Sequence, residues 1–160
     1  MQDALTPSTH DTTRIDDTRI GAVRPLITPA LLQEWQPAPD AAQDLVETSR
    51  AAISRVLHGA DDRLVVVVGP CSIHDHDEAL DYARRLKDEA DRHAAELLVV
   101  MRVYFEKPRT TVGWKGYIND PHRDGSCAIN EGLQMARRLL LDVLAIGLPV
   151  GCEFLDLLSP

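Results

Sequence analysis

Four basic side chains gather in one short segment of this chain, and their types could together hold a small, highly charged anion. They are Arg102, Lys107, Arg109 and Lys115. Only one acid, Glu106, stands among them, although the whole chain has a formal net charge of -8. Guanidinium forks and ammonium groups are the side chains that bind phosphates and carboxylates. The segment follows the apolar run 97–101, so we expect the cations where a buried strand reaches the surface. A solvated basic loop is the alternative.

The tetrapeptide Lys107-Pro108-Arg109-Thr110 has a more specific physical meaning. Pro108 fixes the backbone between two cations and restricts Lys107 to an extended conformation. Thr110 adds a hydroxyl that can donate to a phosphate oxygen. Such a turn could hold two anionic groups at a fixed separation.

Reactive or charged residues also follow the other apolar runs that are expected to form strands. Cys71 follows the run 64–68, and Glu153 closes the last one. In parallel α/β folds, functional groups gather beyond the carboxyl ends of the strands. For Glu153 the roles of general base, water anchor and ion-pair partner all stay open.

Cys71 has three competing interpretations, namely nucleophile, metal ligand and buried apolar residue. His74 is a candidate base for a nucleophile, and His74–Asp77 offers candidate metal ligands. That His-Asp-His-Asp string also opens a helix, so an N-cap at Asp75 or Asp77 is the simpler interpretation. Cys127 and Cys152 are expected to be packing residues, and Trp114 to anchor its loop.

Composition limits the classes of partner. The 160 residues are 44% hydrophobic, enough for one core, and the pI is near 5.1. An acidic chain argues against general nucleic-acid or anionic-membrane binding. Three cysteines without paired spacing and an N-terminus without a signal pattern favour a reducing cytoplasm.

Hydrophobic periodicity predicts alternating helices and buried strands after a polar arm over residues 1–39. Helices are expected over 40–58 (capped by Asp40), 77–93 and 129–146, and strands over 64–68, 97–103 and 149–155. The continuous apolar run 64–68 predicts a strand buried on both faces. This order is typical of right-handed βαβ units with a parallel sheet.

Several motifs together resemble one enzyme family. They are GPCSIHD (69–75), MRVYFEKPRTTVGWKG (101–116), INDPH (118–122), RRLLLD (137–142) and EFLD (153–156). The set closely resembles the feedback-regulated class of 3-deoxy-D-arabino-heptulosonate 7-phosphate (DAHP) synthases. The likeness covers residues 61–160, with a weaker match at 16–20.

The resemblance implies a TIM (β/α)8 barrel that joins phosphoenolpyruvate to erythrose 4-phosphate and releases phosphate, at the entry to the shikimate pathway. It implies that Cys71 is one ligand of an essential divalent metal of Mn, Fe, Co or Zn type. Arg102 and Lys107 would bind phosphoenolpyruvate as catalytic residues, with Tyr104 and Glu153 lining the pocket. Lys107, Pro108, Arg109 and Thr110 would form the erythrose 4-phosphate site.

The resemblance also implies a pocket for an aromatic amino acid effector and homo-oligomer contacts through the arm. The matching effector positions are Asp16, Asp17, Arg19, Phe154, Asp156 and Pro160. Tyr117, Arg123 and Cys127 depart from the family pattern without removing a substrate ligand.

A complete barrel has eight strand–helix units and about 250 residues. This chain is expected to supply about three of these units in residues 61–160, after a regulatory or oligomerisation arm and helix in 1–60. We therefore expect the chain alone to be truncated, inactive and prone to associate through an unpaired sheet edge. The alternative is a non-catalytic effector-binding or subunit-pairing fragment.

Overall fold

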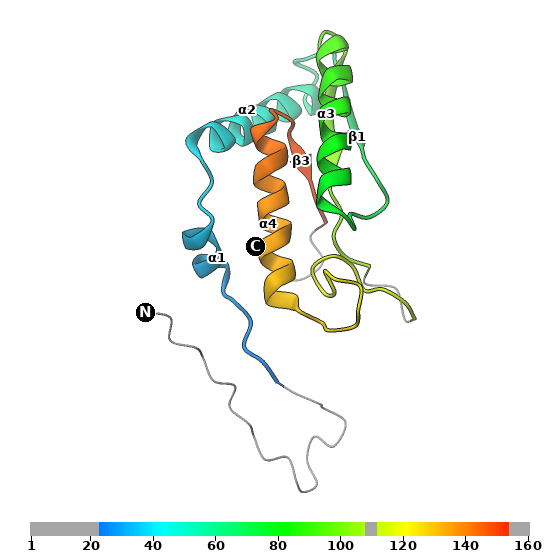
Figure 1. Cartoon of the computed structure of the whole chain (residues 1–160). Coiled ribbons are helices and arrows are strands. Elements are labelled where there is room, and N and C mark those ends of the chain that lie inside the picture. Colours follow the sequence, from blue (N-terminus) through cyan, green and yellow to red (C-terminus); the bar gives the residue numbers. More distant parts are fainter. Residues whose placement is uncertain (1–22, 108–111, 154–160) are drawn as a thin grey trace, which may run out of the picture.

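The computed structural model describes residues 23–107 and 112–153, and it shows an α/β arrangement with a parallel sheet (Figure 1). The elements are α1 (Pro29–Trp35), α2 (Asp40–Leu57), β1 (Leu64–Val68), α3 (His76–Arg92), β2 (Leu97–Arg102), α4 (Ile129–Ala145) and β3 (Val150–Gly151). The sheet order is β1-β2-β3, with both pairs parallel. The predicted alternation and the parallel sheet are confirmed. In these ranges no helix has the length and apolar content needed to cross a bilayer.

The two faces of the sheet are covered by different helices. Met101 and Val103 of the second strand segment belong to the main core cluster, together with apolar side chains of α3 and α4. Leu98 and Val100 pack instead against α2, in a second cluster with Ala52. Because side chains alternate along a strand, Arg102 lies on the α2 side of the sheet. In Figure 1 α2 crosses one end of the sheet, and the loop between β2 and α4 lies at the opposite end.

The helix α1 was not predicted from the sequence. Thr28 caps it, since its Oγ1 accepts the Leu31 N–H at 3.3 Å, and Pro29 occupies the first turn. Leu32 is its one buried residue, at 0% exposure. Seven residues with a single buried position show no helical periodicity, so tertiary contacts rather than pattern reveal this helix.

The caps of the longer helices agree only in part with prediction. Asp75 is the N-cap of α3, and its carboxylate accepts the Glu78 N–H at 2.9 Å. This confirms the prediction that Asp75 or Asp77 caps the helix. Asp40 is not the cap of α2, because Pro39 occupies that position and Asp40 lies in the first turn. In the first turn its negative charge still interacts favourably with the helix dipole.

The prediction that the first strand is buried on both faces is wrong in this structure. Leu64 and Val67 are 64% and 59% exposed. Among the described elements β1 pairs only with β2, and the α2 cluster reaches no further along it than Val65. The apolar composition of β1 is typical of a central, covered strand, but the described elements leave part of it exposed.

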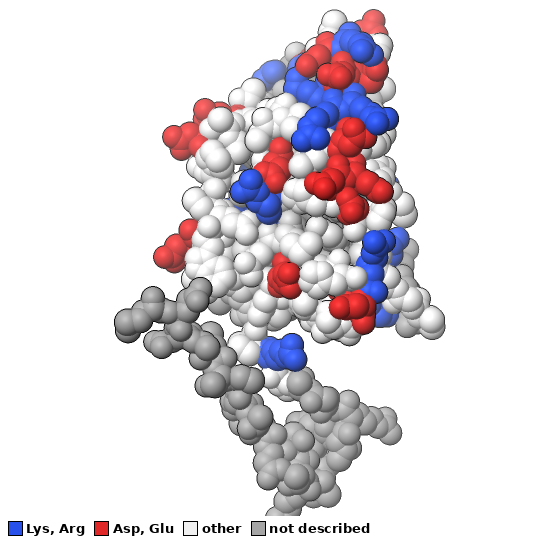
Figure 2. All heavy atoms as spheres, viewed as in Figure 1, with Lys and Arg blue, Asp and Glu red and all other residues white. Residues whose placement is uncertain are grey.

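Charged side chains of both signs are interspersed on the face of the molecule shown in Figure 2. Several form pairs one turn apart on helices, such as Arg85 with Asp81 at 2.8 Å on α3. Exposed pairs of this kind contribute little to stability. They keep the outer face of α3 polar while Ala79 and Ala83 are buried.

Gly132 permits close contact between α4 and the loop that precedes it. A Cβ at this position would lie 2.0 Å from the carbonyl oxygen of Ile118. The first turns of α4 therefore rest directly on the backbone of the β2–α4 loop, which positions that loop against the core.

We expect Gly132→Ala to lower the free energy of unfolding by about 1–3 kcal/mol, because the methyl group forces this contact apart. The sign is diagnostic, since helix propensity alone would make alanine better by about 1 kcal/mol. Urea unfolding followed by circular dichroism measures the difference. Arg138→Ala, on the exposed side of the same helix, is the control. A Gly132→Ala chain as stable as the parent would contradict the contact.

Candidate active site

Arg102 lies at the end of β2 with its guanidinium over an aromatic ring. Its Cζ is 4.5 Å from the centroid of the Tyr104 ring, a cation–π arrangement. The buried Arg102 Nε has no hydrogen-bond partner among the described residues. A buried N–H without a partner is costly, so this guanidinium is prepared for an acceptor from outside the described chain.

Gly69 brings the end of β1 against Arg102. A Cβ on Gly69 would lie 2.2 Å from the Arg102 carbonyl oxygen, so only glycine fits. The next residues, Pro70 and Cys71, therefore start beside the strand that carries the guanidinium. Cys71 itself is exposed, so of its three interpretations the buried apolar residue is wrong.

Glu153 connects the end of β3 to the beginning of the basic loop. Its Oε1 accepts the backbone N–H groups of Phe105 and Glu106, each at 2.6 Å. Its Oε2 is buried without a hydrogen-bond partner in the described ranges. The carboxylate thus fixes two backbone amides directly before Lys107, and its second oxygen is open to a donor.

The basic loop leaves and returns as a short antiparallel pair. Glu106 and Gly116 form an isolated bridge, and the Lys107 N–H donates to the Lys115 carbonyl at 3.1 Å. The Tyr117 N–H donates to the Phe105 carbonyl at 2.6 Å. This closed base holds the backbones of two of the four cations side by side.

Side-chain hydrogen bonds connect the loop to the residues that follow it. The Asn119 Nδ2 donates to Glu106 Oε1 at 3.2 Å, and the Trp114 Nε1 donates to the Asp120 carbonyl at 2.7 Å. Trp114 is therefore a loop anchor, as predicted. Asn119 and the buried Asp120, whose carboxylate accepts the Gly125 N–H, were missed as loop organisers. The only signal for them was the INDPH motif itself.

The three departures from the family pattern have local consequences in this loop. Tyr117 is buried and stacks on Phe105, with ring centroids 6.1 Å apart. Burial raises the pKa of its phenol, and the charges of Asp75 and Asp77 raise it further. Arg123 and Cys127 have positive φ angles of 58° and 52°, a conformation that side chains other than glycine adopt at a cost.

The His-Asp-His-Asp string is used for structure. His74 pairs with Glu78 at 3.2 Å, Asp75 caps α3, and His76 pairs with Asp142 at 3.2 Å. Within the described ranges no three histidine, cysteine, aspartate or glutamate side chains gather as a metal centre. Cys71 supplies one exposed sulfur donor, and the described part of the chain does not complete a metal site around it.

Cys127 and Cys152 are exposed, so the prediction that they are packing residues is wrong. Cys127 lies in the turn before α4, where its positive φ directs the chain into the helix. Cys152 follows β3, and desolvation raises the pKa of its thiol, with a further contribution from Glu153. Of the three cysteines, Cys71 is the one that follows the first strand.

Comparison with known proteins decides the family of this chain. Residues 38–160 match the family model described as "DAHP synthetase I family". The chain belongs to this family. The three strand ends and the loop base described above lie within the matched residues.

Related members extend the likeness to named enzymes. A "Phospho-2-dehydro-3-deoxyheptonate aldolase" of Amycolatopsis methanolica is 59% identical over 146 residues, which are 91% of this chain and 72% of the relative. The "Phe-sensitive" enzyme of Escherichia coli K12 is 54% identical over 145 residues, covering 91% of this chain and 41% of the relative. A solved structure from Francisella tularensis has a TM-score of 0.84 at 48% identity and covers 88% of this chain and 41% of its own. The chain thus spans less than half the length of the latter two.

For this DAHP synthetase I family member, the structure brings together part of the predicted site. Arg102, Tyr104, Lys107 and Glu153 lie at the ends of two neighbouring strands, and their ligands remain predictions. Cys71, the predicted metal ligand, is described and exposed, whereas the other predicted substrate and effector positions fall outside the described residues. They are Asp16, Asp17, Arg19, Pro108, Arg109, Thr110, Phe154, Asp156 and Pro160.

His122 links the family's INDPH motif to α4 in a way that depends on pH. Its Nε2 lies 3.0 Å from Glu131 Oε2, and this hydrogen bond raises the pKa of His122 above the ordinary value of 6.5. A raised folded-state pKa means that the pair contributes stability at pH values below about 6.5. That contribution is lost as the pH rises through the raised pKa.

We expect an NMR titration to place the pKa of His122 above 6.5, and Glu131→Gln to lower it. Asp124→Asn should lower it less, because Asp124 acts on His122 only through its more distant charge. An unchanged His122 titration in Glu131→Gln would show that the pair does not form in solution.

Proposed function

We propose that this chain serves DAHP synthesis, in which phosphoenolpyruvate, erythrose 4-phosphate and water give DAHP and phosphate. The observation that carries the proposal is the gathering of Arg102, Tyr104 and Lys107 with Glu153 at one edge of a parallel sheet. That edge lies inside the segment matched by the family model. We further propose that the three parallel strands belong to a TIM barrel.

Arg102 and Lys107 are proposed to bind phosphoenolpyruvate. The Tyr104 ring supports one face of the Arg102 guanidinium, so its N–H edge can meet a carboxylate or phosphate in the plane. Lys107 adds a point charge from a backbone that is fixed on both sides. Two anionic substrates repel each other, and fixed cations offset this repulsion while they hold the reacting groups close.

Erythrose 4-phosphate is proposed to bind at Lys107, Pro108, Arg109 and Thr110, with Arg109 as the main phosphate partner. The closed base of the loop supports this role, because it limits where the residues between Lys107 and Lys115 can reach. A loop whose two ends are fixed loses less entropy when a ligand binds than one with free ends.

Cys71 is proposed as one ligand of a divalent metal of Mn, Fe, Co or Zn type. Cys71 is exposed two residues after Gly69, which lies against β2, and its thiolate would be a suitable soft donor; the remaining ligands are not found among the described residues. Regulation by an aromatic amino acid through Asp16, Asp17, Arg19, Phe154, Asp156 and Pro160, and homo-oligomerisation through the arm, stay proposals. The relatives' names include Phe-sensitive and tyrosine-inhibited enzymes.

A chimaera tests the proposed reaction. The 145 matched residues of this chain replace those of the Escherichia coli Phe-sensitive enzyme, and phosphate release from the two substrates is measured. We expect an active chimaera, in which Arg102→Leu or Lys107→Met lowers kcat/KM on the order of 10²–10³-fold. Arg85→Gln, 79% exposed on α3, is the matched control and should leave the rate unchanged.

Two outcomes would count against the proposal. A chimaera that folds but releases no phosphate would favour a non-catalytic, effector-binding or subunit-pairing role. An active chimaera that tolerates Arg102→Leu and Lys107→Met would show that these cations do not bind the substrates.

The role of Cys71 has a separate test, which needs no turnover. The chimaera loaded with Co²⁺ should show thiolate-to-cobalt charge-transfer absorption, which Cys71→Ser should abolish. Cys127→Ser is the matched control, since Cys127 is also exposed but belongs to the turn before α4. Absorption that survives Cys71→Ser would remove Cys71 from the ligand set.

A further inference from the structure

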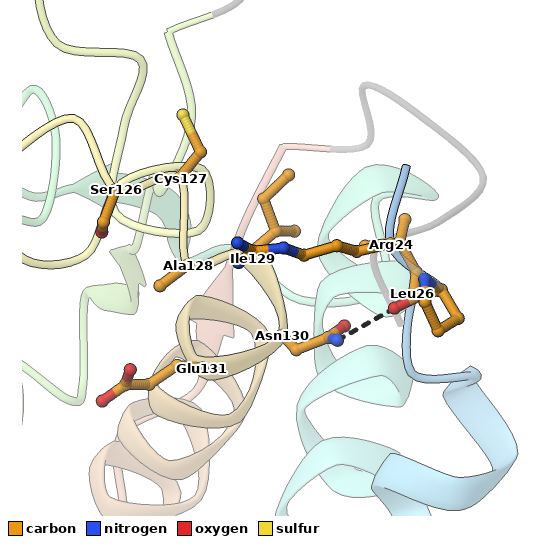
Figure 3. A pocket seen from close by; sticks show the side chains of 9 residues that line it. Arg24, Leu26, Ser126, Cys127, Ala128, Ile129, Asn130 and Glu131 are labelled. Atoms are coloured by element: carbon orange, nitrogen blue, oxygen red, sulfur yellow. Dashed lines mark hydrogen bonds between the residues drawn. The ribbon is translucent and has the colours of Figure 1, made fainter. Parts of the chain in front are cut away.

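One polar stripe on α4 holds a segment from the N-terminal part of the chain. The stripe consists of Asn130, Gln134 and Arg137, which are spaced along one side of the helix. Asn130 contacts the backbone of the arm twice, because its Oδ1 accepts the Ile27 N–H at 2.8 Å and its Nδ2 donates to the Pro25 carbonyl at 3.0 Å. Figure 3 shows Asn130 reaching the arm from the first turn of α4.

The far end of the same segment is held by the other two members of the stripe. The Gln36 Nε2 donates to the backbone carbonyl of Gln134 at 3.2 Å. The Arg137 Nε donates to the backbone carbonyl of Gln36 at 2.7 Å. Arg137 is partly buried, and this desolvation lowers the pKa of its guanidinium. Residues 25–36, called the strap below, are thus held by polar contacts at both ends.

Between these ends the strap has only two apolar anchors in the core. Leu32 is fully buried in the main cluster, and Ile27 packs against that cluster. Two hollows flank the strap. One of about 520 Å³ lies beside Arg24 and the start of α4 (Figure 3), and one of about 530 Å³ lies between Gln33, α2 and Arg137. A segment held by few contacts beside open space belongs to the low-stability parts of a fold.

The anchors of the strap share their cluster with the base of the basic loop. Phe105, Tyr117 and Ile118 belong to the same cluster as Leu32. Helix α4 reaches that loop a second way, from another of its sides, because Gly132 lies directly against the Ile118 carbonyl. The strap and the base of the basic loop thus pack into the same core cluster.

We propose that residues 25–36 form a detachable strap that docks and releases as one unit on the polar stripe of α4, and that its docking orders the base of the basic loop. The inference rests on contacts in this chain and does not depend on which reaction the chain serves. Cooperative release means that loss of the contact at one end of the strap also loosens the other end.

Hydrogen exchange of single amides, followed by NMR in the full chain, measures the release. Arg137→Met keeps a side chain of similar length but has no N–H donor, so it removes only the contact at Gln36, while the Ile27 N–H keeps its own partner, Asn130. If the strap releases as a unit, the Ile27 amide exchanges about three- to tenfold faster, and the Tyr117 amide, which marks the loop base, also exchanges faster. Amides in the middle of α3 should not change.

Two further variants complete the experiment. Arg137→Lys keeps a donor for the Gln36 carbonyl and should restore most of the protection. Arg138→Met removes a neighbouring guanidinium that bonds to Asp142 and not to the strap, so it should leave Ile27 and Tyr117 unchanged. Circular dichroism confirms that each variant keeps its helices.

The outcomes separate clearly. Faster exchange at both Ile27 and Tyr117, reversed by Arg137→Lys, supports the proposal. Faster exchange confined to Gln36 shows a local contact and overturns cooperative release. Faster exchange at Ile27 without any change at Tyr117 overturns the link to the basic loop. A loss of helix in Arg137→Met that Arg137→Lys restores, with Tyr117 still protected, overturns it as well.

Discussion

One carboxylate oxygen, Glu153 Oε1, joins the end of the third strand to the loop that carries the cations. It accepts two consecutive backbone N–H groups, those of Phe105 and Glu106, while the other side of this segment pairs with the return of the loop at Gly116. Backbone donors that are buried without partners are costly, so this single side chain replaces a stretch of sheet. Without it the segment from Phe105 onward would need water or another strand to satisfy its amides, and the closed loop base would lose its starting point.

The site is also defined by the polar atoms that remain without partners. Arg102 Nε and Glu153 Oε2 are both buried without a hydrogen-bond partner among the described residues, and they follow neighbouring strands. Arg102 pairs in the sheet with Gly151, two residues before Glu153, so an ion pair between Arg102 and Glu153 is a conceivable alternative. Such a pair would occupy both groups and leave none for a ligand. In the described structure Arg102 lies over Tyr104 and Glu153 bonds to backbone amides, and the two form no ion pair. The edge of the sheet thus keeps both a donor and an acceptor for a ligand.

Much of the scaffold was predictable from the sequence, because long amphipathic helices and apolar runs show their period directly. The bounds of α2, α3 and α4 agree with prediction within about two residues. Features that arise from contacts far apart in the chain were not predictable. The short helix α1 depends on the burial of Leu32, and the exposure of Leu64 and Val67 depends on which elements cover β1. Asn119 and Asp120 show their role as loop organisers only when the loop is folded back on β2.

The sequence by itself determined the family, the parallel α/β scaffold and the positions of Cys71, Arg102 and Glu153 near strand ends, because these follow from residue types and hydrophobic period. Only the tertiary structure decided what those side chains do next to one another. It showed that Glu153 bonds to backbone amides and that the basic loop closes between Lys107 and Lys115. It also showed that α4 holds the strap through Asn130. The physical reason is that hydrogen bonds and close contacts join residues distant in sequence, and no local pattern records which partners packing will bring together.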